Sequence, residues 1–147
     1  MSIVEHQREK FLISTDKEKL NLQVIFDFLA HQSYWAQGRT IEIIAKSIEH
    51  SLCFGVYESD KQIGFARVVT DYATFGWICD LFVLKTHRQH GLGKWLVEAI
   101  INHPDLRNIR RLVLATLDAH ELYRRYGGFD ALPEADRWMT RVLPYQQ

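Results

Sequence analysis

The sequence predicts an α/β (α+β) fold in which helices flank a mixed, largely antiparallel sheet. Apolar residues recur at helical spacing in some stretches and gather in compact, strand-like runs in others. No linker, repeat or low-complexity segment divides the 147 residues, so we expect one domain over 1–147. The predicted order, β-α-α-β-β-β-α-β-α-β, contains three consecutive strands and therefore favours an antiparallel meander over a doubly wound parallel sheet.

The first predicted elements are a short strand and two helices. Residues 11–14, three of them apolar, predict a short strand, and Ser14-Thr15-Asp16 offers oxygens that can cap a helix. Apolar residues three and four positions apart predict helices over 19–30 and 41–50, with a polar loop at 31–39 between them.

The period then changes to that of strands. Apolar runs predict strands over 52–57, 62–70 and 74–84, and the Ser59-Asp60 turn joins the first two as a hairpin. Residues 71–73 interrupt the pattern before the third strand.

Helical spacing returns over 91–102 and stops before Pro104, which cannot continue the backbone hydrogen bonds of a helix. A short strand is predicted over 112–116 and a helix over 118–126, ended by two glycines. A last strand is expected over 137–143.

Composition excludes several classes of function. Eighteen basic and eighteen acidic residues give no net charge, which argues against general nucleic-acid binding. No apolar run reaches the roughly 20 residues of a membrane span, and the charged N-terminus does not resemble a signal peptide. The two cysteines lie in apolar runs, which predicts reduced thiols in the core. The histidines are scattered, which predicts no metal site. We therefore expect a cytoplasmic protein without membrane contact.

The stretch R-Q-H-G-L-G lies between a predicted strand and a predicted helix. Glycines let the backbone approach a ligand, and the free N–H groups of a first helical turn attract anions. The stretch lacks the third glycine of a dinucleotide fingerprint and the Gly-Lys-Ser/Thr of a P-loop. Alone, it fits either a pyrophosphate cradle or a plain turn.

A second segment, LYRRYGGF at 122–129, favours the cradle. Together with FVLKTHRQHGLGKWLVEAI, it resembles the GNAT N-acetyltransferase superfamily, whose acetyl-CoA signature is an apolar strand followed by R/Q-x-x-G-x-G/A. The order of elements over about residues 10–143 is also similar to that family. The family segment usually has one glycine before phenylalanine, whereas this chain has Gly127-Gly128.

The resemblance implies where acetyl-CoA would bind, with no metal required. The backbone of one strand would pair with the pantetheine arm, while its side chains stay in the core. The N–H groups of the glycine loop would face the pyrophosphate. Thr116 stands where many family members carry an asparagine that contacts the coenzyme arm. The implied residues are Leu81, Phe82, Val83, Arg88, Gln89, His90, Gly91, Leu92, Gly93, Lys94 and Thr116.

The resemblance also implies a catalytic acid. Tyr123 matches the family tyrosine that protonates the departing thiolate after an amine attacks the thioester and a tetrahedral intermediate forms. The alternative is a helix tyrosine whose ring only packs in the core.

The general base stays open between two residues. Asp80 is a carboxylate inside an apolar strand, where burying a charge is costly unless the charge is paired or hydrated. It is therefore either a base that acts through water or the partner of a buried arginine such as Arg67 in a salt bridge. His120 is the alternative base, or a solvated histidine in a first helical turn.

Aromatic residues suggest a pocket for an amine, drawn from Tyr34, Trp35, Asp71, Tyr72 and Phe75, although Tyr34 and Trp35 also fit hinge packing. The hypothesis is an acetyl-CoA-dependent N-acetyltransferase that acts on a small-molecule amine or an exposed peptide amine. The competing class is a GNAT-like module that senses acyl-CoA with little turnover. Homodimerisation is common in the family and is left open here.

Overall fold

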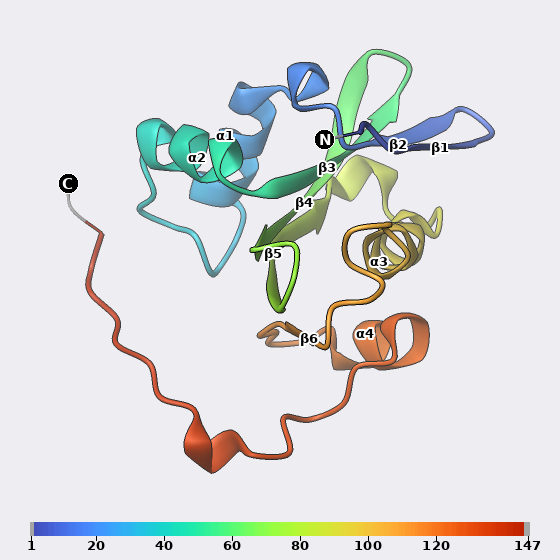
Figure 1. The fold of residues 1–147 in the computed structure, drawn as a ribbon. Helices are drawn as coiled ribbons and strands as arrows, with labels where there is room; N and C mark the ends of the chain where they lie inside the picture. Colours follow the sequence, from blue (N-terminus) through green and yellow to red (C-terminus); the bar gives the residue numbers. More distant parts are fainter. Residues whose placement is uncertain (1, 146–147) are drawn as a thin grey trace.

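A six-stranded sheet carries two helices on each face (Figure 1). The computed structural model describes residues 2–145. The strands are β1 (Glu5–Arg8), β2 (Phe11–Ser14), β3 (Leu52–Glu58), β4 (Lys61–Thr70), β5 (Phe75–Val83) and β6 (Arg111–Val113); the helices are α1 (Leu22–His31), α2 (Ile41–Glu49), α3 (Leu92–Ile101) and α4 (His120–Gly127).

The strands lie in chain order, β1 to β6, and each pair is antiparallel except the last. β5 and β6 are parallel because α3 connects them as a crossover. The mixed, largely antiparallel sheet predicted from the sequence is confirmed, and so is the meander of β3, β4 and β5.

Alternation along the strands produces two apolar cores. Side chains of α3, such as Leu96 and Ile100, pack with Phe54 and Ile78 on one face of the sheet. Side chains of α1 and α2 pack with alternate strand residues, including Phe65, on the other face. The central strands β3 and β4 are therefore buried on both sides.

The predicted helices form, and their starts have a local cause. The side-chain oxygen of Asn21 accepts a hydrogen bond from Val24 N at the start of α1, and Thr40 does the same for Ile43 N at the start of α2. Such caps satisfy backbone N–H groups that lack a partner within the helix. No described helix is long and apolar enough to cross a bilayer.

One terminal prediction was wrong, and one terminal strand was not predicted. Residues 137–143 do not form a strand: apart from Arg137 at the end of a 3-10 turn, they run as an exposed, irregular segment, because none of the six strands of the sheet pairs with them. No local pattern predicted β1, whose four side chains are all exposed and which forms by pairing with β2. The strand predicted over 112–116 forms over Arg111–Val113.

Candidate functional site

Only the first three residues of β5 pair with β6, which is itself three residues long. The register joins Phe75 to Arg111 and ends at Trp77 and Val113, although β5 continues to Val83. The backbone of β5 beyond Trp77 therefore has no strand partner on the β6 side within the described chain. This splayed stretch includes Leu81, Phe82 and Val83, the strand implied for the pantetheine arm. Phe82 and Val83 are buried and Leu81 is partly buried, so their side chains pack while one edge of the backbone stays open.

The glycine loop leads from the end of β5 into α3. Gly91 is the residue before the helix and adopts a left-handed conformation, with φ 71° and ψ 18°, which glycine reaches without strain. No side chain caps the helix. In the described structure, no protein group accepts a hydrogen bond from the backbone N–H groups of residues 89–94. A row of free donors at the positive end of a helix dipole is a site for an anion.

The loop side chains point to several different partners. Arg88 Nε donates to Val83 O over 3.1 Å, which ties the loop back to β5. The His90 ring lies 5.7 Å from the ring of Phe11, and Lys94 Nζ lies 4.7 Å from the ring centroid of Tyr126. The resemblance implied a ligand site made by the backbone of residues 88–94. The N–H of Arg88 donates to Lys85 O, so the free donors of this loop are those of residues 89–94.

A basic residue that sequence reasoning missed lies beside this loop. Arg8 of β1 places its guanidinium 4.6 Å from the centroid of the Trp95 ring, and its terminal nitrogen is 4.0 Å from the position of a Cβ built on Gly91. Arg8 was missed because β1 has no apolar pattern. It adds positive charge at the mouth of the loop.

Tyr123 lies in α4 behind the splayed strands. Its side chain is buried, and burial raises the pKa of the phenol to about 12, so the hydroxyl keeps its proton at neutral pH. Two glycines end the helix after it: Gly127 is the last residue of α4 and lies against Phe129, and Gly128 follows with φ 71°. The ring of Phe129 packs edge-on against Tyr123 at 5.9 Å.

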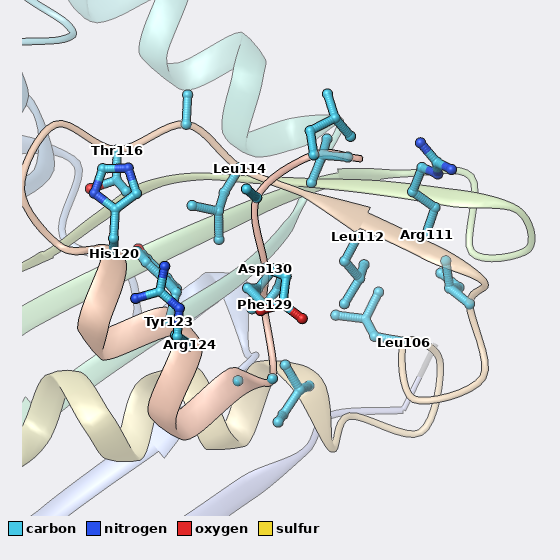
Figure 2. Close-up of a pocket in the computed structure, with 18 of the residues that line it drawn as sticks. Leu106, Arg111, Leu112, Leu114, Thr116, His120, Tyr123, Arg124, Phe129 and Asp130 are labelled. Atoms are coloured by element: carbon cyan, nitrogen blue, oxygen red, sulfur yellow. The ribbon is translucent and has the colours of Figure 1, made fainter. Parts of the chain in front are cut away.

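Tyr123, Thr116 and His120 share one cavity of about 760 Å³ between β6 and α4. Figure 2 shows these three side chains at one end of the cavity and Leu112 and Arg111 at the other. Thr116 Oγ1 accepts a hydrogen bond from Ala119 N over 3.0 Å and so stabilises the start of α4. His120 is exposed in the first turn.

Asp80 occupies a bulge in β5. Phe65 pairs with Phe82 and Arg67 with Cys79, so two residues of β5 oppose one of β4. Asp80 has φ 56°, a conformation that is roughly 1–2 kcal/mol unfavourable for residues other than glycine. The bulge leaves backbone groups outside the β4 ladder next to the splayed strand.

Buried charges hold Asp80 in this conformation. One carboxylate oxygen accepts hydrogen bonds from Arg67 Nε and Arg39 at 2.8 Å each, and the other accepts from Trp35 Nε1 at 3.0 Å and from Arg39 at 2.9 Å. The carboxylate side chain is 1% exposed. The salt bridge to Arg67 is thus present, and Arg39 is a second partner that the sequence did not indicate. A carboxylate with these partners is poorly placed to take a proton from an amine.

The loop before α2 brings Tyr34 and Trp35 to this region. Trp35 is half-buried and donates its Nε1 hydrogen bond to Asp80. Tyr34 Oη accepts a hydrogen bond from Leu117 N over 2.8 Å. Tyr34 is 54% exposed, and its ring packs edge-on against Trp35 at 5.0 Å. The loop therefore connects the bulge in β5 with the segment between β6 and α4.

Asp71, Tyr72 and Phe75 lie at the other end of β5. Phe75 is five residues before Asp80, about 17 Å along a strand at roughly 3.3 Å per residue. Asp71 accepts hydrogen bonds from the Thr74 hydroxyl and from three backbone N–H groups, which hold the pKa of its carboxyl far below the usual range. Tyr72 packs against the α3 core. The structure therefore does not bring these three predicted residues together with Tyr123.

Comparisons with known proteins show which family the chain is similar to. The profile of the acetyltransferase (GNAT) family matches residues 18–129. A crystal structure of a GNAT-family protein from Xanthomonas campestris pv. campestris is 40% identical, covers 94% of this chain and 96% of its own, and superposes with a TM-score of 0.89. A protein of Gibberella zeae, named as an inferred acetyltransferase, is 28% identical over 88% of this chain and 84% of its own length.

A more distant structure has its ligand in place. The GNAT-family acetyltransferase of Elizabethkingia anophelis, solved with acetyl-CoA bound, is 17% identical, covers 82% of this chain and 76% of its own, and has a TM-score of 0.61. No group of three or more residues suited to hold a metal ion occurs among residues 2–145.

Proposed function

Because the chain belongs to the GNAT family of acetyltransferases, we propose that it transfers the acetyl group of acetyl-CoA to a primary amine, either of a small molecule or exposed on a peptide. The observation that carries this proposal is the juxtaposition of unpaired backbone donors at residues 89–94, the open edge of β5 and the hydroxyl of Tyr123, whose ring is buried. These features supply an anion site, an edge for an extended arm and a proton donor.

Acetyl-CoA would bind along the gap between β5 and β6. Its pyrophosphate would accept hydrogen bonds from the backbone of the glycine loop, with Arg8 nearby as a cation. Its pantetheine amides would pair with the open backbone edge of Leu81 to Val83. This arrangement directs the thioester toward the bulge at Asp80.

The reaction is a direct transfer. The neutral amine attacks the thioester carbonyl carbon, the C–N bond forms, and the carbonyl oxygen gains negative charge that unpaired backbone N–H groups at the bulge would stabilise. The C–S bond then breaks as Tyr123 gives its proton to the thiolate. The nitrogen loses a proton to solvent, and solvent returns a proton to the Tyr123 phenolate. The products are the N-acetyl amine and free coenzyme A.

Deprotonation of the amine is assigned to water near His120 rather than to Asp80. His120 lines the same cavity as Tyr123 and faces solvent. Asp80 is assigned as a positioning residue, because its oxygens are occupied by two arginines and an indole. This occupation of the carboxylate is also the observation that favours the second candidate, a module that binds acyl-CoA with little turnover.

The decisive experiment measures acetyl-CoA binding and turnover separately. Calorimetry is expected to show acetyl-CoA binding, and a thiol assay across polyamines, amino acids, antibiotics and peptides is expected to show release of free coenzyme A with acetylated product in the mass spectrum. Binding without release for any amine would support the sensor module. Absence of both would overturn the proposal.

A matched pair of glycine substitutions tests the anion site. Gly91 and Gly128 have the same φ of 71°, and alanine at either position meets no close neighbour, so both changes should lower the free energy of unfolding by a similar amount, roughly 1–2 kcal/mol. Only Gly91→Ala should weaken acetyl-CoA binding, because it distorts the donor row. Calorimetric titration of both variants measures this, and equal affinities would remove the loop from the site.

A further inference from the structure

The hairpin of β1 and β2 lies against the glycine loop. Arg8 is the cross-strand partner of Phe11, and because such partners share one face of a sheet, Arg8 lies on the α3 face, where Phe11 joins the core. The ring of Phe11 is 5.7 Å from the ring of His90 in the loop. The Arg8 guanidinium lies 4.6 Å from the centroid of the Trp95 ring. The hairpin therefore contacts both the loop and the start of α3.

Arg8 reaches the row of free backbone donors. Trp95 N donates to Gly91 O over 3.0 Å, so these two residues lie one helical turn apart on the same side of α3. The guanidinium lies over the Trp95 ring, and its Nη1 atom is 4.0 Å from the position of a Cβ built on Gly91. The cation therefore lies at the edge of the anion site formed by residues 89–94.

The charge of Arg8 has no counter-ion among residues 2–145, whose carboxylates form no salt bridge with it. Lys10, two residues further along the same hairpin, differs, because its Nζ lies 3.3 Å from Glu58 Oε2. A guanidinium has a planar set of donors that can bind two phosphate oxygens at once. An unpaired one beside free backbone donors is therefore suited to bind a phosphate group.

β1 is an edge strand with little to hold it. It pairs only with β2, over four residues, and its four side chains are exposed. A strand that buries so little apolar surface opens locally at a lower cost than the unfolding of the whole domain. A ligand that bound Arg8 and the loop together would therefore stabilise β1 in its paired position.

We propose that the hairpin is part of the coenzyme site, in which Arg8 binds the pyrophosphate directly and bound coenzyme holds β1 closed. The inference rests on the proposed function, because it takes acetyl-CoA as the ligand. A pyrophosphate on the N–H groups of residues 89–94 would present its remaining oxygens to the Arg8 guanidinium. The face of the Trp95 ring positions that guanidinium, and so acts on the coenzyme through Arg8.

Calorimetry of Arg8→Gln tests the contact. Acetyl-CoA affinity is expected to fall about tenfold, because a charge-assisted hydrogen bond to phosphate is lost. Arg8→Lys should lie between this variant and the wild type, since an ammonium keeps the charge but not the planar donors. Lys10→Gln is the matched control, because it removes the same charge from the same hairpin. Its affinity should stay within about twofold of wild type, since Glu58 already compensates Lys10.

Dephospho-coenzyme A shows which phosphate Arg8 binds. It keeps the pyrophosphate and lacks the ribose 3′-phosphate, so Arg8→Gln should weaken its binding by the same factor as that of coenzyme A. A loss confined to coenzyme A would assign Arg8 to the 3′-phosphate and overturn the pyrophosphate contact. Unchanged affinity of Arg8→Gln, in a protein whose wild type binds acetyl-CoA, would overturn this inference and leave the proposed function standing. A wild type that binds no acetyl-CoA would overturn both.

Hydrogen exchange tests the coupling to the hairpin. Saturating acetyl-CoA should slow exchange at the β1 amides that pair with β2, and reciprocity sets the slowing at about the factor by which Arg8→Gln weakens binding. In Arg8→Gln, acetyl-CoA should still slow exchange in the glycine loop but no longer in β1. Arg8 is exposed, so the variant should fold and its circular dichroism should be unchanged. Exchange in β1 that acetyl-CoA leaves unaltered in the wild type, or slows equally in Arg8→Gln, would contradict the coupling.

Discussion

Replacing Tyr123 by phenylalanine is expected to lower kcat for acetyl transfer by roughly 10²-fold to 10⁴-fold, the usual contribution of a positioned proton donor. Acetyl-CoA affinity should stay the same, because the change removes one hydroxyl and leaves the buried ring in place. Stopped-flow or steady-state thiol release gives kcat, and calorimetry gives the affinity. Since burial raises the pKa of this phenol to about 12, the wild-type rate should not fall through its ionisation at moderately alkaline pH.

Tyr126→Phe is the matched control for this change. Tyr126 lies one turn further along α4, with its ring beside Lys94 Nζ, and it does not line the cavity with Tyr123. Its rate should stay close to wild type. If Tyr123→Phe transferred acetyl groups as fast as Tyr126→Phe, another group would have to supply the proton.

Replacing Asp80 by asparagine is expected to destabilise the fold by about 3–5 kcal/mol, because it leaves two buried arginines without a counter-charge. Arg67 and Arg39 side chains are 8% and 11% exposed, so water can compensate little of the loss. The bulge would also lose the contacts that hold φ at 56°. Urea unfolding measures the change as a lower midpoint.

Asp27→Asn provides the comparison. Asp27 is an exposed residue of α1 whose carboxylate accepts a hydrogen bond from Gln23, so its replacement should change stability by less than about 0.5 kcal/mol. The result that would contradict a positioning role is an Asp80→Asn protein with wild-type stability and no acetyl transfer. That outcome would instead indicate the general base.

Periodic apolar patterns predicted the sheet and the helices because, in the middle of the chain, the apolar residues of the pattern are the residues that are buried. The two cores require alternate residues of β3 and β4 to face opposite helices, and a continuous apolar run is the signature of such strands. The glycine loop could also be predicted from local sequence, because the left-handed conformation of Gly91 is one that glycine adopts without strain.

The remaining features depend on contacts between distant residues. β1 exists only through pairing with β2, and Arg8 reaches the loop only because that pair forms. Arg39 meets Asp80 across 41 positions of sequence, which no local pattern indicates. A strand was predicted over 137–143, but a strand also needs a paired neighbour, and none of the six strands of the sheet pairs with these residues.

The loop before α2 is tied to both halves of the site. Tyr34 holds the backbone of Leu117, and Trp35 and Arg39 hold Asp80 in the strand that would bind acetyl-CoA. An amine substrate that contacts this loop would therefore affect β5, the strand along which acetyl-CoA would bind. Binding of the two substrates should be cooperative, and reciprocity requires each to change the affinity of the other by the same factor.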